Sequence, residues 1–224
     1  MTPLLRFAGA TFRYAGAQRP SLEDLSFVVS AGEVLALTGA PGSGTSTLLL
    51  VAGGFAPRLT GGALTGDFES HSKRPAIVFA TPWTQLTGLC HSVRAEVAFG
   101  PASFALPRSE VLARAEAAMA ALGVAHLTDR DPATLSGGEL QRVIVASALA
   151  LEPDLLLLDD PAAELDPEAA DSLYRLLGEL AAMGAAVLVA TPDVERARRT
   201  ATRALALERG KIVRDGPPSE VIEP

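Results

Sequence analysis

Apolar and polar residues alternate in two stretches near the N-terminus, residues 4–14 and 22–29. The segment Gly16-Ala17-Gln18-Arg19-Pro20 separates them and is typical of a turn. Alternation on both sides of a turn predicts two antiparallel strands. Continuous apolar runs follow and predict short buried strands at 34–38, 76–79, 155–158, 186–190 and 201–207. Residues 208–216 contain a glycine turn and predict a closing hairpin with the last of these strands.

Helical periodicity appears in three other places. Residues 110–122 place apolar side chains on one face and stop at Gly123. A second helix is expected after Ser136, with an apolar face that runs from Leu140 to Leu151. Asp166 and Pro167 suit the cap and first position of a third helix. The arginines of the next segment are expected to form a solvated helix face: Arg196, Arg198, Arg199 and Arg203. Strands and helices in this order predict an α/β domain.

Ser136 and Glu139 have the spacing of a capping box, in which serine caps the first helical turn and glutamate returns to the serine amide. Two glycines, Gly137 and Gly138, lie between them and are expected to leave the helix start open to an anion.

A second candidate anion site follows the strand at 34–38. The segment Gly39-Ala40-Pro41-Gly42-Ser43-Gly44-Thr45-Ser46-Thr47 is a glycine-rich turn that leads into a helix. In this context, inward-pointing backbone amides and the helix dipole favour phosphate binding.

Composition limits the possible functions. The chain has 224 residues, enough for one large domain, and a formal net charge of −7, which disfavours a nucleic-acid partner. The single cysteine, Cys90, excludes an internal disulfide. No signal peptide or bilayer-spanning run is expected.

Together these motifs resemble the ABC-type ATPases. The run Leu135-Ser136-Gly137-Gly138-Glu139-Leu140-Gln141-Arg142 is similar to their signature motif, the strand ending at Asp159 to Walker B, and the glycine-rich loop to Walker A. The resemblance implies a P-loop NTPase fold in a single domain, residues 1–224, with an N-terminal antiparallel β subdomain. The core is expected at 1–80 and 135–224, with an inserted, alanine-rich helical subdomain at 81–134.

ATP and Mg²⁺ are the implied ligands. The implied metal ligands are Ser46 and Asp159, and the implied catalytic residues are Asp160 and Asp166. Residues implied to contact the nucleotide are Tyr14, Gly39, Gly42, Ser43, Gly44, Thr45, Ser46, Thr47, Ser136, Gly137, Gly138 and Gln141. Two alternatives stay open: Tyr14 can stack on adenine or simply pack at a sheet edge, and Asp166 can be a D-loop residue or only a helix cap.

Four positions depart from the family pattern. Thr45 replaces the Walker A lysine, Ala80 the Q-loop glutamine, Asp160 the catalytic glutamate and Pro192 the switch histidine. The lysine is a large loss, because a charge pair at about 4 Å is worth roughly 4 kcal/mol at an effective dielectric of 20. All four lost groups serve the chain's own nucleotide, whereas the motifs offered to another subunit's nucleotide, the signature and Asp166, are intact.

This pattern predicts the degenerate half of an asymmetric ATPase pair, with a second ABC ATPase subunit and integral membrane subunits as partners. The stretch from Ser92 to Pro101 resembles the energy-coupling-factor and cobalt-type importers. The expected location is the cytoplasmic face of the cell membrane, reached through the membrane partner. Two alternatives remain, a slow homodimeric ATPase and a non-catalytic scaffold or regulator.

Overall fold

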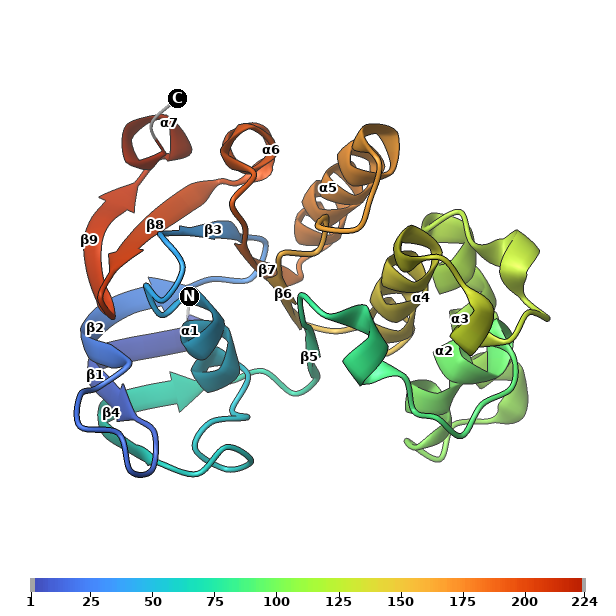
Figure 1. Ribbon diagram of the computed structural model, residues 1–224, viewed down its shortest axis with the longest axis horizontal. Helices are drawn as coiled ribbons and strands as arrows, with labels where there is room; N and C mark the ends of the chain where they lie inside the picture. The colour runs from blue at the N-terminus through green and yellow to red at the C-terminus, as the bar shows by residue number, and fades with distance from the viewer. Residues whose placement is uncertain (1–2, 223–224) are drawn as a thin grey trace.

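Two lobes make up the protein in the computed structural model, which describes residues 3–222 (Figure 1). The larger lobe holds both β-sheets, and the smaller lobe is helical. The first sheet is antiparallel and has the order β2-β1-β4, formed by Leu22–Val29, Leu5–Arg13 and Ala63–Ser70. The expected pair of N-terminal antiparallel strands is thereby confirmed.

The second sheet has six strands in the order β5-β6-β7-β3-β8-β9. Its first five strands are parallel, and β9 is antiparallel to β8. Their bounds are Pro75–Val78, Leu155–Asp159, Ala186–Ala190, Val34–Thr38, Arg203–Glu208 and Lys211–Gly216. The apolar runs of the sequence therefore correspond to the parallel strands, of which β3, β6 and β7 are buried on both faces.

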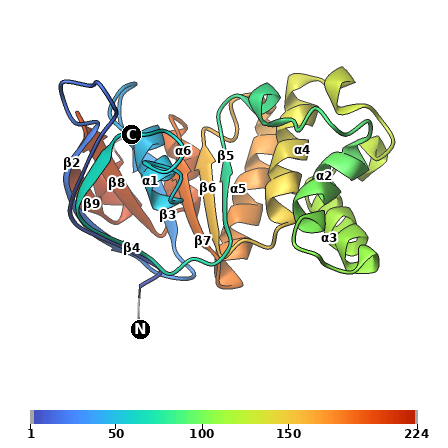
Figure 2. The same ribbon diagram turned by 90° about the horizontal axis from the view of Figure 1, so that it is seen from below.

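Helix α1 (Thr45–Ala52) lies between the two sheets, as Figure 2 shows from below. Leu48 and Leu49 of α1 share one hydrophobic core with Phe7 and Phe12 of β1 and with Leu37 of β3. The other face of the six-stranded sheet is covered by α5 (Pro167–Ala182), α6 (Val194–Thr200) and α7 (Pro218–Val221). The N-terminal sheet thus holds α1, and the loop that precedes it, against the main sheet.

The helical lobe contains α2 (Val93–Ala102), α3 (Arg108–Ala121) and α4 (Gly137–Leu149). Short 3₁₀ turns at Pro82–Gln85, Ala125–Leu127 and Pro132–Thr134 connect them to the rest of the chain. Helix α4 packs beside α2 and α3, so the helix predicted from the capping box lies in this lobe. It ends at Leu149, so Leu151, the last residue of the predicted apolar face, lies beyond the helix.

The predicted arginine face is wrong in one respect. Arg196, Arg198 and Arg199 lie on α6, but Arg203 is the first residue of β8. Its guanidinium donates two hydrogen bonds of 2.6 Å to the carboxylate of Asp215 on β9. Arg196 is also engaged, with Asp171 at 2.7 Å and with Asp193. These two arginines are structural ion-pair partners and not a free cationic surface.

Candidate nucleotide-binding site

The glycine-rich loop connects the end of β3 to the start of α1. Gly44, the residue before the helix, has a φ of 109°, which a residue with a side chain rarely adopts. A Cβ atom there would lie 2.8 Å from the carbonyl oxygen of Ser21, so the loop also needs glycine for close packing. Gly44 offers no side-chain cap, and the first turn of α1 contains no acidic residue. The first amides of α1 are therefore available to an anion.

Hydroxyl groups follow directly on the first turn of α1. Thr45 occupies the lysine position and is half-buried, whereas Ser46 is exposed. The Thr47 hydroxyl lies 3.4 Å from the Tyr14 hydroxyl, which brings the aromatic ring at the end of β1 beside the helix start. The ring of Tyr14 also stands edge-on to Phe12, with 4.8 Å between ring centroids. The structure therefore places Tyr14 beside the start of α1, next to the loop.

The carboxyl ends of the parallel strands meet at the same edge of the sheet. Asp159 is in register with Ala190 of β7, and Ala190 is in register with Leu37 of β3. The phosphate loop begins two residues after Leu37, so Asp159 lies two strands from it along this edge. Ligands of α/β proteins bind outside this edge. Hydroxyl and carboxylate oxygens such as those of Ser46 and Asp159 are the donors that Mg²⁺ prefers, so the donor set fits this ion.

Asp160 lies in a crowded acidic environment just beyond Asp159. Burial and the neighbouring carboxylates of Asp159 and Asp193 raise the pKa of Asp160 above its ordinary value. Burial also acts to raise the pKa of Asp193, but hydrogen bonds from the Arg196 backbone and guanidinium outweigh it and hold that pKa low. A carboxyl with a raised pKa retains its proton more readily. Pro192, beside this cluster, is exposed and offers no titratable group.

Ala80 occupies the position of the Q-loop glutamine. Ala80 is exposed just after β5, so no side chain there can reach a metal ion. Gln85 is instead turned toward the end of β5, where its amide accepts from the Phe79 amide at 3.1 Å and donates to the Phe79 carbonyl at 3.3 Å. Both polar atoms of the Gln85 amide are thus engaged with the backbone of Phe79.

The capping box at the start of α4 is present. Glu139 accepts a hydrogen bond from the Ser136 amide at 2.8 Å, and the Ser136 hydroxyl accepts one from the Glu139 amide at 3.4 Å. These contacts with Ser136 lower the pKa of Glu139. Arg130 adds an ion pair at 3.2 Å. The helix start is therefore fixed by its own side chains.

The two glycines at the start of α4 are partly exposed, and Glu164 packs on one side of them. A Cβ atom on Gly137 would lie 2.6 Å from Oε2 of Glu164, and one on Gly138 would lie 2.8 Å from the Glu164 carbonyl oxygen. The segment that follows Walker B thus packs on the two glycines. Asp166 caps α5 by accepting from the Ala169 amide at 2.9 Å and is itself exposed.

Gln141 does not fit the role implied for it. Its side chain is fully buried, and neither amide atom has a hydrogen-bond partner within residues 3–222. A nucleotide outside the helical lobe cannot reach it in this arrangement. Its position one turn inside α4 gives the physical reason, because only the helix start is exposed to a ligand.

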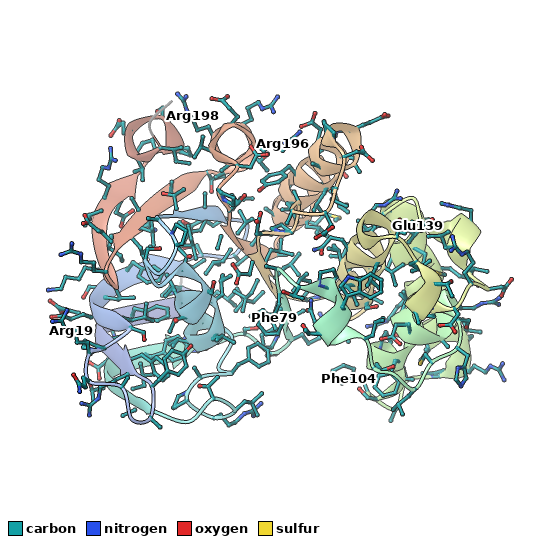
Figure 3. All side chains as sticks on the ribbon, in the orientation of Figure 1. Arg19, Phe79, Phe104, Glu139, Arg196 and Arg198 are labelled. Carbon is teal, nitrogen blue, oxygen red and sulfur yellow. The ribbon has the colours of Figure 1, made fainter. Side chains whose placement is uncertain are left out.

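The two candidate half-sites lie in different lobes. Figure 3 shows Arg19, beside the β1–β2 turn, at one end of the molecule and Glu139, on α4, toward the other. The phosphate loop is packed against the β1–β2 turn through Gly44 and Ser21, whereas the signature belongs to the helical lobe. One chain therefore does not close its own loop and its own signature around the same ligand.

Comparison with known proteins identifies the family. The ABC transporter family profile matches residues 22–163. The nickel import ATP-binding protein NikO of Rhodobacter capsulatus is 37% identical over 238 residues, covering 99% of this chain and 92% of the relative. The chain belongs to the ABC transporter ATP-binding proteins.

Other relatives agree with this assignment. The energy-coupling factor transporter ATP-binding protein EcfA of Methanothermobacter thermautotrophicus is 36% identical over 211 residues, covering 90% of this chain and 67% of the relative. The solved structure of cbiO1 from Clostridium perfringens, described as part of the transporter complex cbiONQ, superposes with a TM-score of 0.84. That match has 27% identity and covers 98% of this chain and 90% of cbiO1. The predicted P-loop ABC ATPase fold is confirmed, and membership of this family implies ATP and typically Mg²⁺ as ligands.

Two residues that the sequence did not single out also border the phosphate loop. Arg19, before β2, and Arg209, in the β8–β9 turn, line a cavity of about 460 Å³ together with Gly44 and Thr45–Thr47. Their neighbours Pro20 and Gly210 mark turns, but no signal in the sequence joins the two turns to the loop.

Proposed function

We propose that the protein is an ATP-binding subunit of a membrane transporter and the degenerate half of an asymmetric ATPase pair. In this role its signature helix, α4, completes a nucleotide site on a competent partner subunit. The observation that carries the proposal is the one-sided loss of chemistry: Thr45, Ala80, Asp160 and Pro192 all belong to the chain's own site. The capping box of Ser136 and Glu139 is complete.

The distribution of the two half-sites supports a dimer. Because the loop and the signature lie in different lobes, a nucleotide held between both motifs needs a second subunit. The cassette MJ0796, which is 24% identical and superposes with a TM-score of 0.84, is described as dimeric. We extend this arrangement to the present chain as part of the proposal.

In the chain's own site, ATP would lie on the glycine-rich loop with its base against Tyr14. Amides of Gly42, Ser43 and Gly44 and the first turn of α1 would hold the phosphates. Ser46 and Asp159 would hold Mg²⁺, which stabilises the charge that develops during phosphoryl transfer. Asp160 is one methylene shorter than glutamate, so its carboxylate reaches less far toward an attacking water and is poorly placed to accept its proton.

A groove between the lobes supports a membrane partner. It has a volume of about 340 Å³, lies between β5, α2 and α4, and is lined by apolar side chains such as Phe55, Phe99 and Leu151. Phe99 is 45% exposed, and Leu89 nearby in sequence is 70% exposed. No described helix of the chain is long and apolar enough to cross a bilayer. We propose that a cytoplasmic segment of the membrane subunits covers this groove and holds the protein at the cytoplasmic face.

The names of the relatives suggest a class of substrate. NikO and CbiO of Rhodobacter capsulatus are described as nickel and cobalt import proteins. We propose an importer of the energy-coupling-factor or cobalt type, in which the membrane subunits select the substrate. A slow homodimeric ATPase remains the second candidate, because the loop, Ser46 and Asp159 are all retained.

The test is the ATPase rate of the complex purified through a tag on this chain. Gly137→Asp is the sharper variant, because its Cβ meets only the flexible end of Glu164 and an acidic residue suits a helix N-terminus. The proposal expects the rate to fall at least tenfold, with Ser136→Arg giving the same result. Ser30→Arg, at an exposed loop position, is the matched control and leaves the rate unchanged. Undiminished hydrolysis in both signature variants would contradict the proposal.

A further inference from the structure

The cavity beside the phosphate loop is strongly cationic. Among the residues that the structure describes, its lining contains two arginines, Arg19 and Arg209, and no acidic residue. The remaining lining comes from Pro20 and Ser21, from glycines of the loop and from the hydroxyl-bearing first turn of α1. Thr45, which stands where the family has a lysine, faces the same cavity. Two positive charges therefore border the place from which one positive charge is missing.

Backbone contacts hold both arginine-bearing turns against the loop. The Gly210 amide donates to the Ser43 carbonyl at 2.8 Å, and the Glu23 amide donates to the Gly210 carbonyl at 2.8 Å. A Cβ atom on Gly210 would lie 2.6 Å from the Ser21 carbonyl oxygen. The β8–β9 turn is thus in close contact with both the loop and the β1–β2 turn. The backbone next to Arg209 and the backbone two residues after Arg19 are therefore held beside the loop.

Arg19 and Arg209 have side chains without a partner among residues 3–222. Both are exposed, and within the described part of the chain neither makes an ion pair or a side-chain hydrogen bond. Lys211, the next cation along β9, differs because it pairs with Glu23 at 3.1 Å. The adjoining surface hollow is lined by the same two arginines together with Glu23, Glu208 and Lys211, so each arginine borders both hollows.

Unpaired guanidinium groups beside free helix amides are suited to phosphate. Arginine presents several donors in a planar fork and binds phosphate oxygens through paired, charge-assisted hydrogen bonds. A threonine at position 45 supplies only a neutral hydroxyl. We propose that Arg19 and Arg209 bind the phosphate groups of the nucleotide in this chain's own site and replace the missing Walker A cation. This inference rests on the proposed nucleotide-binding function and deepens it.

The proposal makes the site selective for phosphate number. Arginines that contact phosphates discriminate ATP and ADP from AMP, because each added phosphate brings further charge and further acceptor oxygens. They contribute little to recognition of the base. The chain would then keep a nucleotide bound at a site that does not hydrolyse it efficiently.

Calorimetry on the purified full chain with Mg²⁺ tests the proposal, using ATP, ADP and AMP as probes. Unmodified protein is expected to bind ATP and ADP. Arg19→Gln and Arg209→Gln are each expected to weaken ATP binding about tenfold, and the double variant more strongly. AMP binding changes much less. Arg58→Gln removes an exposed arginine that does not line the cavity, and it is the matched control for the change in charge.

Thr45→Lys in the double variant provides a second measurement. If the arginines replace the lysine, this change restores ATP affinity, which also shows that the double variant folds. Failure of the unmodified chain to bind ATP, or equal affinity in the double variant, would overturn the inference. Those results would leave the proposed function standing if Gly137→Asp still stops hydrolysis in the complex. Arginine-dependent binding with undiminished hydrolysis in Gly137→Asp would instead support the arginine site and contradict the proposed function.

Discussion

The backbone amide of Asp160 donates a hydrogen bond to the carbonyl oxygen of Ala190 at 2.7 Å. Asp160 is the residue that follows the last residue of β6. This contact extends the pairing of β6 and β7 by one residue. Asp160 adopts a φ of 44°, a conformation in which aspartate and asparagine are the best tolerated residues after glycine. The hydrogen bond therefore holds a carboxylate in a strained position beside Asp159 and Asp193.

Asp160→Asn should stabilise the protein at neutral pH. The pKa of Asp160 is raised on folding, so the folded state gains less from ionisation than the unfolded state once the pH exceeds the ordinary value of 3.8. Asparagine removes this penalty and tolerates the backbone conformation. We expect the melting temperature at pH 7 to rise by about 2 °C, with the gain shrinking toward pH 4. A gain that is constant from pH 4 to 7 would show that charge is not the cause.

Tyr14 variants distinguish its two possible roles. If the ring stacks on adenine, Tyr14→Phe keeps most of the ATP affinity and Tyr14→Ala lowers it about tenfold. The hydroxyl contact with Thr47 is long, at 3.4 Å, so its loss should matter little. Binding measured with ATP and with inorganic triphosphate separates the outcomes. If Tyr14 only packs at the sheet edge, Tyr14→Ala lowers the melting temperature and affects both ligands alike.

Glu164→Gln should favour nucleotide at the partner's site. The Glu164 carboxylate lies against Gly137 at the helix start where the proposed dimer would place the partner's phosphates. Removing a negative charge there lowers the repulsion of an anion. We expect a lower KM for ATP in the complex with little change in kcat. A matched Glu168→Gln change, also exposed and in the first turn of α5, should leave KM unchanged.

Thr87→Ala should destabilise the fold. Glu96 on α2 is only 4% exposed, and its two carboxylate oxygens accept from the Thr87 amide and the Thr87 hydroxyl, both at 2.7 Å. The variant leaves one oxygen of a buried carboxylate without its hydroxyl donor, which costs about 2 kcal/mol. Urea unfolding measures the loss. Thr87→Ser retains the donor and should lie within about 0.5 kcal/mol of the unmodified chain.

The elements that the sequence predicted are those whose burial follows a simple period. In β2, buried residues recur along the strand with exposed residues between them. Helix α5 begins at Pro167 and has its buried apolar residues on one face. Helix α2 had no comparable signal, because it contains Gly100 and Pro101 near its end. Its capping serine, Ser92, was the available clue, since its side chain accepts from the Ala95 amide.

Motif residues of the site could be located from the sequence because they are contiguous. The phosphate loop, the Walker B strand and the signature motif each consist of a few consecutive residues. The environment of those motifs could not be read in the same way. Glu164 against Gly137, and Arg19 and Arg209 beside Thr45, are brought together by chain folding between distant segments. Burial of Gln141 likewise depends on which helix face meets the neighbouring elements.

Gly44 packs against Ser21, and Gly210 packs against the phosphate loop. These contacts join the N-terminal sheet, the closing hairpin and the central strand, so folding itself requires the loop to keep its shape. Selection for a stable domain would preserve the glycines even after nucleotide binding had ceased. The glycine pattern of this loop therefore indicates descent from a nucleotide-binding protein and does not by itself indicate present nucleotide binding. Present nucleotide binding has to be inferred from the side chains that line the cavity.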